Sequence, residues 1–243
     1  MPRFFITHAS DDGFITLVGA DAHHVARVLR MKAGDEITLC DSSGLDFDCV
    51  IERMTGDTVV CSVQDTHPSA GEPSVKTTLY MAMPKADKME LIIQKAVELG
   101  AVRIVPFLGS RSVSRPDEKG LARKTERWCR IAAEAAGQCG RGIIPEVAET
   151  ISFTQAVHQA AKAQTALFFY ECERDTSLRA ALTGKNLTTV SLMIGPEGGF
   201  APDEVTAAKA GGLLSVSLGP RILRCETAPL AALAAVMYES GNF

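Results

Sequence analysis

The sequence predicts an α/β protein in which a small β-barrel domain precedes a larger domain with a parallel sheet. Residues 1–72 hold short strand-forming segments that are separated by turn residues, a pattern typical of a small barrel. Residues 73–243 instead alternate apolar strand segments with amphipathic helices, a pattern typical of a parallel sheet covered on both faces. The stretch 67–74 (HPSAGEPS) is rich in Pro, Gly and Ser, so we place the domain boundary there, at residues 72 and 73.

The first domain is expected to be mainly β-structure. Its predicted strands are short and rich in β-branched residues, and they cover residues 14–18, 36–40, 46–52 and 58–64. Gly34-Asp35, Ser43-Gly44 and Gly56-Asp57 supply turns between them.

One helix is expected to interrupt these strands. Asp21 is a residue type that caps helix N-termini, and it precedes three apolar residues at helical spacing. The pattern predicts that Val25, Val28 and Leu29 form the buried stripe of this helix.

The second domain alternates between the two element types. Strands are predicted at residues 77–83, 102–108, 166–170, 191–194 and 214–218, and helices at 88–99, 121–139, 203–210 and 228–238. Helix 88–99 should bury one face, which consists of Met89, Ile92, Ile93, Ala96 and Val97, and Gly100 should end it. Helix 228–238 is almost wholly apolar, which suits burial or a subunit interface.

Composition and charge exclude several classes of protein. The net charge is −4, but its distribution is uneven: residues 1–75 carry −7, residues 76–150 carry +4 and residues 151–243 carry −1. A local basic face can bind phosphate even in an acidic chain.

No apolar run is long enough to span a membrane and the first residues do not form a leader, so we expect a cytoplasmic protein. Seven cysteines without a CxxC pair predict neither a disulfide framework nor a metal site.

Three predicted strands end in loops that suit a ligand. They are followed by Tyr170-Glu171-Cys172, by Gly195-Pro196-Glu197-Gly198-Gly199 and by Gly219-Pro220-Arg221. Ligands of open α/β sheets bind at the carboxyl ends of strands, and glycines allow backbone to approach them closely. The second loop is neither a Walker loop nor GxGxxG, which disfavours P-loop NTPases and Rossmann dinucleotide enzymes.

At these loops the sequence resembles a known family. IGPEGGF at 194–200 and LGPRILRCETA at 218–228 resemble motifs of the SPOUT superfamily of RNA methyltransferases. Within it, three further segments resemble the RsmE family, which makes 3-methyluridine in 16S ribosomal RNA. They are HHVARVLRMKAGDEI (23–37), KMELIIQKAVELGA (88–101) and EAAGQCGR (134–141).

The resemblance implies a more specific fold and activity than the residue pattern does. Residues 73–243 would form an α/β trefoil-knot methyltransferase domain, and residues 1–72 a PUA-like β-barrel that binds RNA. The cofactor would be S-adenosylmethionine (SAM), without a metal, and the partners would be the 16S rRNA of the small ribosomal subunit and a second copy in a homodimer. The implied cofactor-binding residues are Leu167, Phe169, Tyr170, Glu171, Ile194, Gly195, Pro196, Glu197, Gly198, Gly199, Leu218, Gly219, Arg221, Ile222, Leu223, Thr227 and Ala228.

The implied acceptor determines which side chains could act in catalysis. Uracil N3 carries a proton at neutral pH, so its methylation needs a general base or a cation that stabilises the uracilate. Arg224 is our first choice for the cation, with Arg221 beside it; Glu197 or Glu226 could accept the proton if burial raised its pKa. For Glu226, an interaction with the N-terminus of the following helix is an equal alternative. Cys225 is interpreted as a packing residue, because N3 methylation needs no thiol nucleophile.

RNA contacts are expected from basic residues of both domains. The candidates are Arg3, Arg27, Arg30, Lys32, Arg111, Arg115, Arg123, Arg127 and Arg141. Two other readings stay open: a SPOUT 2′-O-ribose methyltransferase acting on tRNA or rRNA, and an RNA-binding assembly factor without enzymatic activity.

Overall fold

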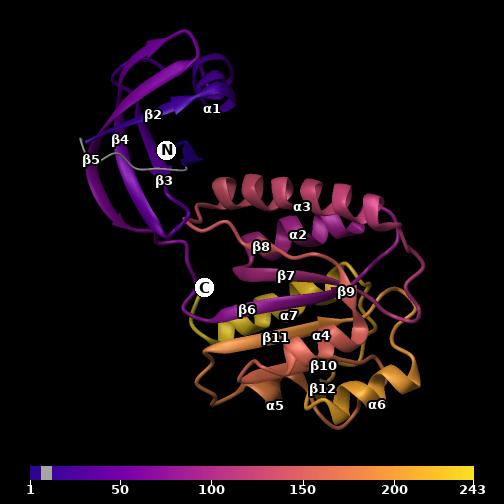
Figure 1. The fold of residues 1–243 in the computed structure, drawn as a ribbon. Coiled ribbons are helices and arrows are strands. Elements are labelled where there is room, and N and C mark those ends of the chain that lie inside the picture. Colours follow the sequence, from indigo (N-terminus) through magenta and orange to yellow (C-terminus); the bar gives the residue numbers. More distant parts are fainter. Residues whose placement is uncertain (7–12) are drawn as a thin grey trace. The chain divides into compact units, whose positions relative to one another are not determined.

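The computed structural model describes residues 1–6 and 13–243, and these residues form two compact units (Figure 1). Unit 1 comprises residues 1–72 together with 136–144. Unit 2 comprises residues 73–135 and 145–243. The chain therefore returns to unit 1 through the last turn of the long helix α3 (Glu118–Cys139).

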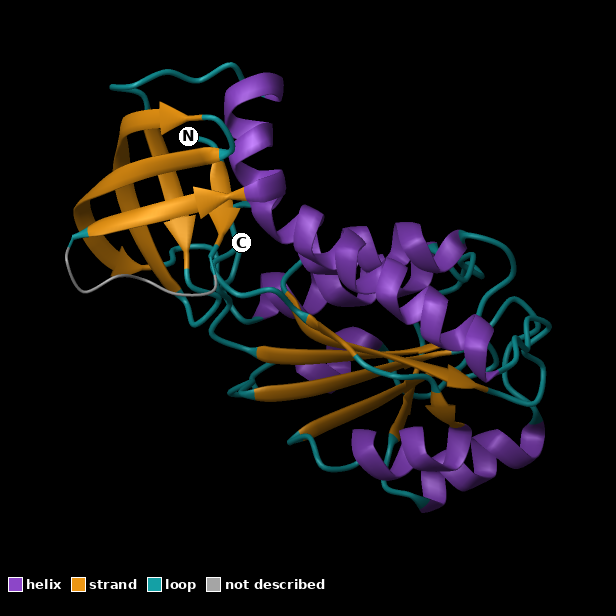
Figure 2. Cartoon of the chain, turned by 45° about the horizontal axis from the view of Figure 1, so that its top comes forward, coloured by secondary structure: helices purple, strands orange, loops and turns teal. Residues whose placement is uncertain are grey.

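Unit 1 is built on a curled sheet (Figure 2). In spatial order its strands are β1 (Arg3–Phe5), β3 (Glu36–Cys40), β4 (Leu45–Thr55), β5 (Thr58–Pro68) and β2 (Phe14–Val18). β1 pairs with β3 in parallel, and the other neighbours are antiparallel. β4 and β5 run further than the sequence predicts, with two register irregularities, and β5 includes part of the stretch that we interpreted as a linker. Apolar side chains such as Ile15, Ile37 and Leu39 form its core.

The helix of unit 1 differs from the prediction. It consists of a short α-helix, α1 (Gly19–His23), that continues as one π-helical turn, η1 (His24–Val28). The N-cap is Val18, so Asp21 lies inside the first turn. The Leu29 N–H donates to the carbonyl of His24, five residues back, and this wider turn leaves Val28 and Leu29 exposed. The predicted buried stripe is therefore wrong beyond Val25.

A buried ion pair attaches the segment after α3 to unit 1. Arg141 is 2% exposed, and one of its guanidinium nitrogens lies 2.8 Å from a Glu72 carboxylate oxygen. The backbone N–H groups of Gly142 and Ile143 donate to the other oxygen of Glu72 at 3.1 and 3.0 Å. The carboxylate is thus fully engaged by a segment about seventy residues further along the chain.

Unit 2 is built on a parallel sheet. Its strands run in the order β12 (Leu214–Val216), β10 (Thr165–Phe169), β11 (Thr189–Ile194), β6 (Lys76–Ala82), β7 (Ala101–Leu108) and β8 (Glu146–Val147), while β9 (Ile151–Ser152) also pairs with β7. Every pairing is parallel, as the sequence predicts.

Helices cover both faces of this sheet. α2 (Lys88–Glu98) and α7 (Thr227–Glu239) pack against each other and against the central strands, and α4 (Phe153–Ala160) and α6 (Pro202–Ala210) form a second packed pair. The predicted inner face of α2 is confirmed, since all of its five apolar residues are buried. α4 and the short α5 (Leu178–Leu182) do not appear among the predicted elements.

The path of the chain after β12 brings the C-terminal loops together. β12 lies at the edge of the sheet, yet the next helix, α7, packs against β11, β6 and α2 near the centre. Residues 217–226 therefore lead from the edge of the sheet back toward its centre. The predicted architecture, a small β-rich domain before a parallel α/β domain, is confirmed.

Candidate active site

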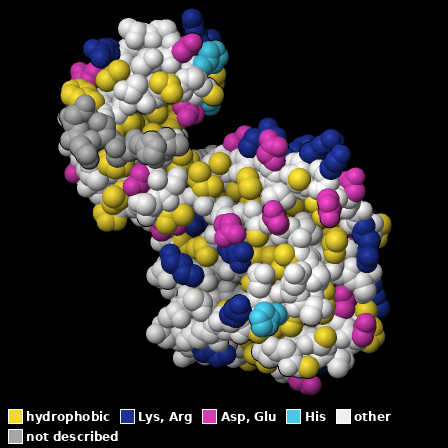
Figure 3. Space-filling model, viewed as in Figure 1, with side chains coloured by type: hydrophobic (Ala, Val, Ile, Leu, Met, Phe, Trp, Pro, Cys, Tyr) yellow, Lys and Arg dark blue, Asp and Glu magenta, His cyan; other side chains and the backbone are white. Residues whose placement is uncertain are grey.

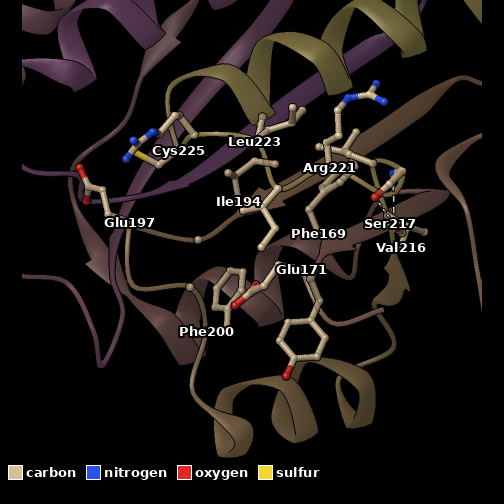
Figure 4. Close-up of a pocket in the computed structure, with 18 of the residues that line it drawn as sticks. Phe169, Glu171, Ile194, Glu197, Phe200, Val216, Ser217, Arg221, Leu223 and Cys225 are labelled. Carbon is tan, nitrogen blue, oxygen red and sulfur yellow. Dashed lines mark hydrogen bonds between the residues drawn. The ribbon is translucent and has the colours of Figure 1, made fainter. Parts of the chain in front are cut away.

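A cavity of about 560 Å³ lies where β10, β11 and β12 end (Figure 4). The three loops that follow these strands form its wall, as expected for an open α/β sheet. Figure 4 shows Glu197 and Cys225 at one end of the site and Arg221 and Ser217 at the other, with Ile194 between them.

Nearly all of the predicted cofactor-binding residues line this cavity. Two do not: Leu167 is fully buried in β10 below it, and Thr227 begins α7 outside its wall. The lining also includes residues that sequence reasoning did not select for the cofactor: Arg174, Phe200, Val216, Ser217, Pro220, Arg224 and Cys225. Phe200 is part of the quoted IGPEGGF motif, so that motif could have identified it.

Aromatic packing fixes the end of the second loop. The ring of Phe200 is 2% exposed, and its centroid lies 4.2 Å from that of Phe168 and 6.4 Å from that of Phe107. Phe168 and Phe107 belong to β10 and β7, so the loop after β11 is anchored to the core of the sheet. Such packing limits the movement of the cavity wall on this side.

Two glycines of the second loop allow close approach. Gly199 has φ +64°, and a side chain there would collide with the Glu171 carboxylate of the first loop. A Cβ atom at Gly195 would lie 3.0 Å from the Phe200 ring. Glycine at these positions thus allows the second loop to pack tightly against Phe200 and against the Glu171 side chain of the first loop.

A lysine joins the second and third loops at one end of the cavity. Lys88, the first residue of α2, places its Nζ 3.1 Å from Glu197 Oε1 and 3.1 Å from Glu226 Oε2. The same Nζ lies 3.7 Å from Cys225 Sγ. The N–H of Lys85 donates to Glu197 Oε1 at 3.1 Å. Sequence reasoning did not select Lys88 as a site residue, although it begins the quoted segment KMELIIQKAVELGA; its partners lie more than one hundred positions away.

The charges of this network affect the predicted role of Glu197 and Glu226 as proton acceptors. Burial acts to raise the pKa of Glu197, but hydrogen bonds from its own N–H, from Lys85 and from Lys88 outweigh it, so the pKa is lowered. Hydrogen bonds from its own N–H, from Cys225 and from Lys88 lower the pKa of Glu226. Neither carboxyl group has the raised pKa that a strong general base requires.

Cys225 is suited to packing rather than to nucleophilic chemistry. It is 7% exposed, and burial, followed by the nearby carboxylates of Glu226 and Glu197, raises the pKa of its thiol to about 12. The thiol is therefore protonated at neutral pH, and it donates to Glu226 Oε2 at 3.2 Å.

Three arginines line the cavity, and they differ in their hydrogen-bond partners. Arg174 donates to the backbone carbonyls of Glu171 and Glu173 at 2.7 and 2.9 Å, which fixes the first loop. Arg221 and Arg224 are exposed and line the cavity, so the third loop presents two cations there. A guanidinium in this position can stabilise an anion that develops on a bound substrate.

Comparison with known proteins identifies the family. An RNA methyltransferase domain model matches residues 71–237, and an RNA methyltransferase PUA domain model matches residues 17–64. The ribosomal RNA small subunit methyltransferase E of Bacillus subtilis is 35% identical, with alignment over 99% of this chain and 97% of the relative. The chain belongs to this family of RNA methyltransferases.

Solved structures of similar proteins share the fold over nearly the whole chain. A putative methyltransferase from Legionella pneumophila in complex with SAM matches with a TM-score of 0.86 at 32% identity, covering 97% of this chain and 96% of that one. A ribosomal RNA small subunit methyltransferase E from Neisseria gonorrhoeae bound to SAM gives a TM-score of 0.86 at 29% identity, covering 98% and 97%.

Two of the arginines expected to bind RNA are engaged by carboxylates of unit 1. Arg3 donates to both carboxylate oxygens of Asp46, at 2.6 and 2.7 Å, and Asp46 is 1% exposed. Arg141 is the buried partner of Glu72 described above. Both guanidinium groups pair with carboxylates that are buried or nearly so, and these contacts are structural.

The other RNA candidates fall into two groups. Arg111 and Arg115 donate to backbone carbonyls, Arg111 to Gly198 at 2.9 Å and Arg115 to Gly109 and Ser110, while Arg127 pairs with Glu90 at 2.7 Å. Arg27, Arg30 and Lys32 are exposed around η1, and Arg123 is exposed on α3. Figure 3 shows Lys and Arg side chains gathered along α3, interspersed with Asp and Glu.

Within residues 1–6 and 13–243, no helix has the length and apolarity needed to cross a membrane. In the same described residues, His, Cys, Asp and Glu do not form a group of three or more that could hold a metal ion.

Proposed function

We propose that the protein transfers the methyl group of SAM to N3 of a uridine in the 16S rRNA of the small ribosomal subunit. The observation that carries this proposal is the cavity formed by three loops at the ends of β10, β11 and β12. Similar proteins from Legionella and Neisseria, with the same fold at 32% and 29% identity, are described as bound to SAM. The RsmE resemblance supplies the finer assignment of base and position.

The residues at the cavity fit SAM. Apolar side chains such as Ile194 and Leu223 can contact the adenine faces, and the backbone of Gly195, Gly199 and Gly219 leaves room for close contacts. Glu171 and Glu197 place negative charge at the cavity, which complements a cationic sulfonium. When bound, SAM supplies an already activated methyl group, so the protein's task is to position the acceptor and stabilise its charge.

Arg224 has the central role in the proposed chemistry. Loss of the N3 proton leaves a uracilate anion, and an exposed guanidinium on the third loop can stabilise it. Glu197 and Glu226, whose pKa values are lowered, remain ionised and serve to hold Lys88 and the loops in this proposal. Arg221 adds a second positive charge at the same loop.

The remaining parts of the chain are assigned to RNA binding and assembly. We propose that unit 1 acts as a PUA-like RNA-binding domain with Arg27, Arg30 and Lys32, and that α3 contributes Arg123. The apolar helix α7, which leaves Leu230 and Ala234 half-buried in the single chain, supports a homodimer. We propose cytoplasmic action on the ribosomal subunit.

Nucleoside analysis tests this proposal. 16S rRNA from cells lacking the protein should lose 3-methyluridine, and its expression from a plasmid should restore the modified nucleoside. Loss of a ribose-methylated nucleoside instead would favour a 2′-O-methyltransferase. An unchanged nucleoside profile, together with no SAM binding in calorimetry, would favour an assembly factor without enzymatic activity.

A further inference from the structure

Lys88 is placed where it can control the shape of the cavity without lining it. It follows β6 and begins α2, whereas the cavity is lined by the loops after β10, β11 and β12. Its ammonium group reaches Glu197 of the second loop and Glu226 of the third loop at equal distances of 3.1 Å. One cation thus joins two loops and a helix that are far apart in the sequence.

This arrangement differs from an ordinary lysine–carboxylate pair. On the same helix, Lys95 pairs with Glu98 at 2.8 Å, three residues away, so that pair connects two positions of one rigid element. The two lysine side chains are similarly accessible, at 33% for Lys88 and 39% for Lys95. They therefore share chemistry and burial, and only Lys88 bridges separate segments.

The second loop is held on its other flank by a different element. Arg111, in the segment after β7, donates to the carbonyl of Gly198 at 2.9 Å. Lys88 and Lys85 hold the adjacent residue, Glu197, from the side of β6. The Lys88 contact to Glu226 then extends this support to the third loop.

We propose that Lys88 is a positioning residue that ties the second and third loops together and so holds the cavity in the shape that SAM requires. The inference rests on the proposed function for the identity of the bound molecule. It assigns Lys88 no contact with the reacting atoms.

Removal of this lysine has a specific electrostatic consequence. Glu197 and Glu226 both lie against the same ammonium group, so its loss leaves two like charges on facing loops. The Cys225 thiol beside them is a neutral donor and offers no compensating charge. The loops should therefore separate, rather than only lose one attractive contact.

Hydrogen exchange of the protein without SAM tests the positioning role directly. In K88M, amides of 194–199 and 217–226 should exchange about tenfold faster than in the wild type, the size expected from roughly 1.4 kcal/mol of lost local stability. K95M is the matched control and should leave these amides unchanged. K88R keeps a cation between the carboxylates and should restore most of the protection.

A double variant separates positioning from general stability. E226Q removes one of the two like charges, so K88M/E226Q should exchange more slowly at 194–199 than K88M alone. Faster exchange spread over the whole chain in K88M would overturn the proposal, as would loop exchange equal to that of the wild type.

Calorimetry with SAM then connects the loops to binding. K88M should raise the Kd for SAM about tenfold, with K88R close to the wild type and K95M unchanged. Wild-type Kd in K88M would overturn the role of Lys88. If the wild type itself did not bind SAM, the proposed function would fail, whereas the exchange experiment would still test whether Lys88 ties the loops.

Discussion

Two regions of the molecule use ion pairs in different ways. In unit 1, the carboxylates of Asp46 and Glu72 are each matched to one arginine, and their side chains are only 1% and 13% exposed. In unit 2, Lys88 is shared between two half-exposed carboxylates on loops that form a cavity wall. Both arrangements join a basic side chain to carboxylates. The unit 1 pairs are enclosed by protein, and we call them closed pairs, whereas the Lys88 network lies at the edge of a cavity and is open.

This difference indicates which ion pairs matter for stability and which for binding. Asp46 also accepts a hydrogen bond from Ser69, and Glu72 accepts two from backbone N–H groups, so both carboxylates are well supplied with donors. A closed pair contributes by keeping a buried charge satisfied. The Lys88 network contributes little burial, and its effect should appear in the geometry of the loops instead.

The largest effect should come from breaking a closed pair. D46N leaves the Arg3 guanidinium without its buried partner and should lower the free energy of unfolding by about 3–5 kcal/mol in urea denaturation. D48N, on the same strand, is the matched control: Asp48 is 38% exposed in its pair with His67, so the expected loss is below about 1 kcal/mol. Equal losses in the two variants would contradict the distinction between closed and open pairs.

The pH dependence of this effect follows from the pKa of Asp46. Burial acts to raise that pKa, but hydrogen bonds from Arg3 and Ser69 and the charge of Arg3 lower it overall. The stability from Asp46 is therefore present above its unfolded pKa of about 3.9 and is lost as pH falls through the lower folded value. The difference between wild type and D46N should be widest near neutral pH and should narrow in acid.

The next largest effect should be on turnover. R224A should lower kcat by about 10²–10³-fold, because it removes the cation proposed to stabilise the uracilate, while leaving the Kd for SAM within about threefold. R179A changes an exposed arginine on α5 and should leave kcat unchanged. Near-normal turnover in a folded R224A protein would remove Arg224 from the mechanism.

A glycine exchange tests the close approach of the loops. G199A places a methyl group against the Glu171 carboxylate, which must move at the cavity wall, so the Kd for SAM should rise about tenfold, or roughly 1.4 kcal/mol. Gly212 also has positive φ, at +91°, but no atom lies within 4 Å of the added carbon. G212A therefore matches the backbone strain without the collision, and it should leave SAM binding unchanged in calorimetry.

The smallest effect should come from the cysteine at the cavity. C225S keeps a hydroxyl donor for Glu226 and should change kcat by less than about threefold, since a thiol with a pKa of about 12 is not a nucleophile at neutral pH. Complete loss of activity with unchanged SAM affinity would show that Cys225 takes part in the reaction.

Local sequence patterns predict the elements of the sheet well and the details of one helix poorly. The apolar face of α2 follows from regular 3.6-residue spacing, and the structure confirms it. The same spacing fails at Val28 and Leu29, because the π-helical turn of η1 shifts them out of the stripe. A change of helix type within one short segment leaves no signal in an apolar pattern.

The residues of the candidate site could likewise be predicted only in part. The loops could be located because each one follows a strand and carries a distinctive motif. The partners of Arg3 and Lys88 could not be predicted, since they lie more than forty and more than one hundred residues away, respectively. Such contacts depend on tertiary packing. The structure was therefore needed to assign roles to the charged residues, even to those whose position near the site could be predicted from the sequence.

The most direct test of the proposed reaction follows a labelled methyl group. The purified protein should be incubated with SAM carrying an isotopic label in its methyl group and with small ribosomal subunits from cells lacking the protein. Nucleoside mass spectrometry of the 16S rRNA should find the label in 3-methyluridine, and R224A should transfer far less. Label found only on a ribose, or no transfer to RNA by an enzyme that binds SAM, would contradict the account.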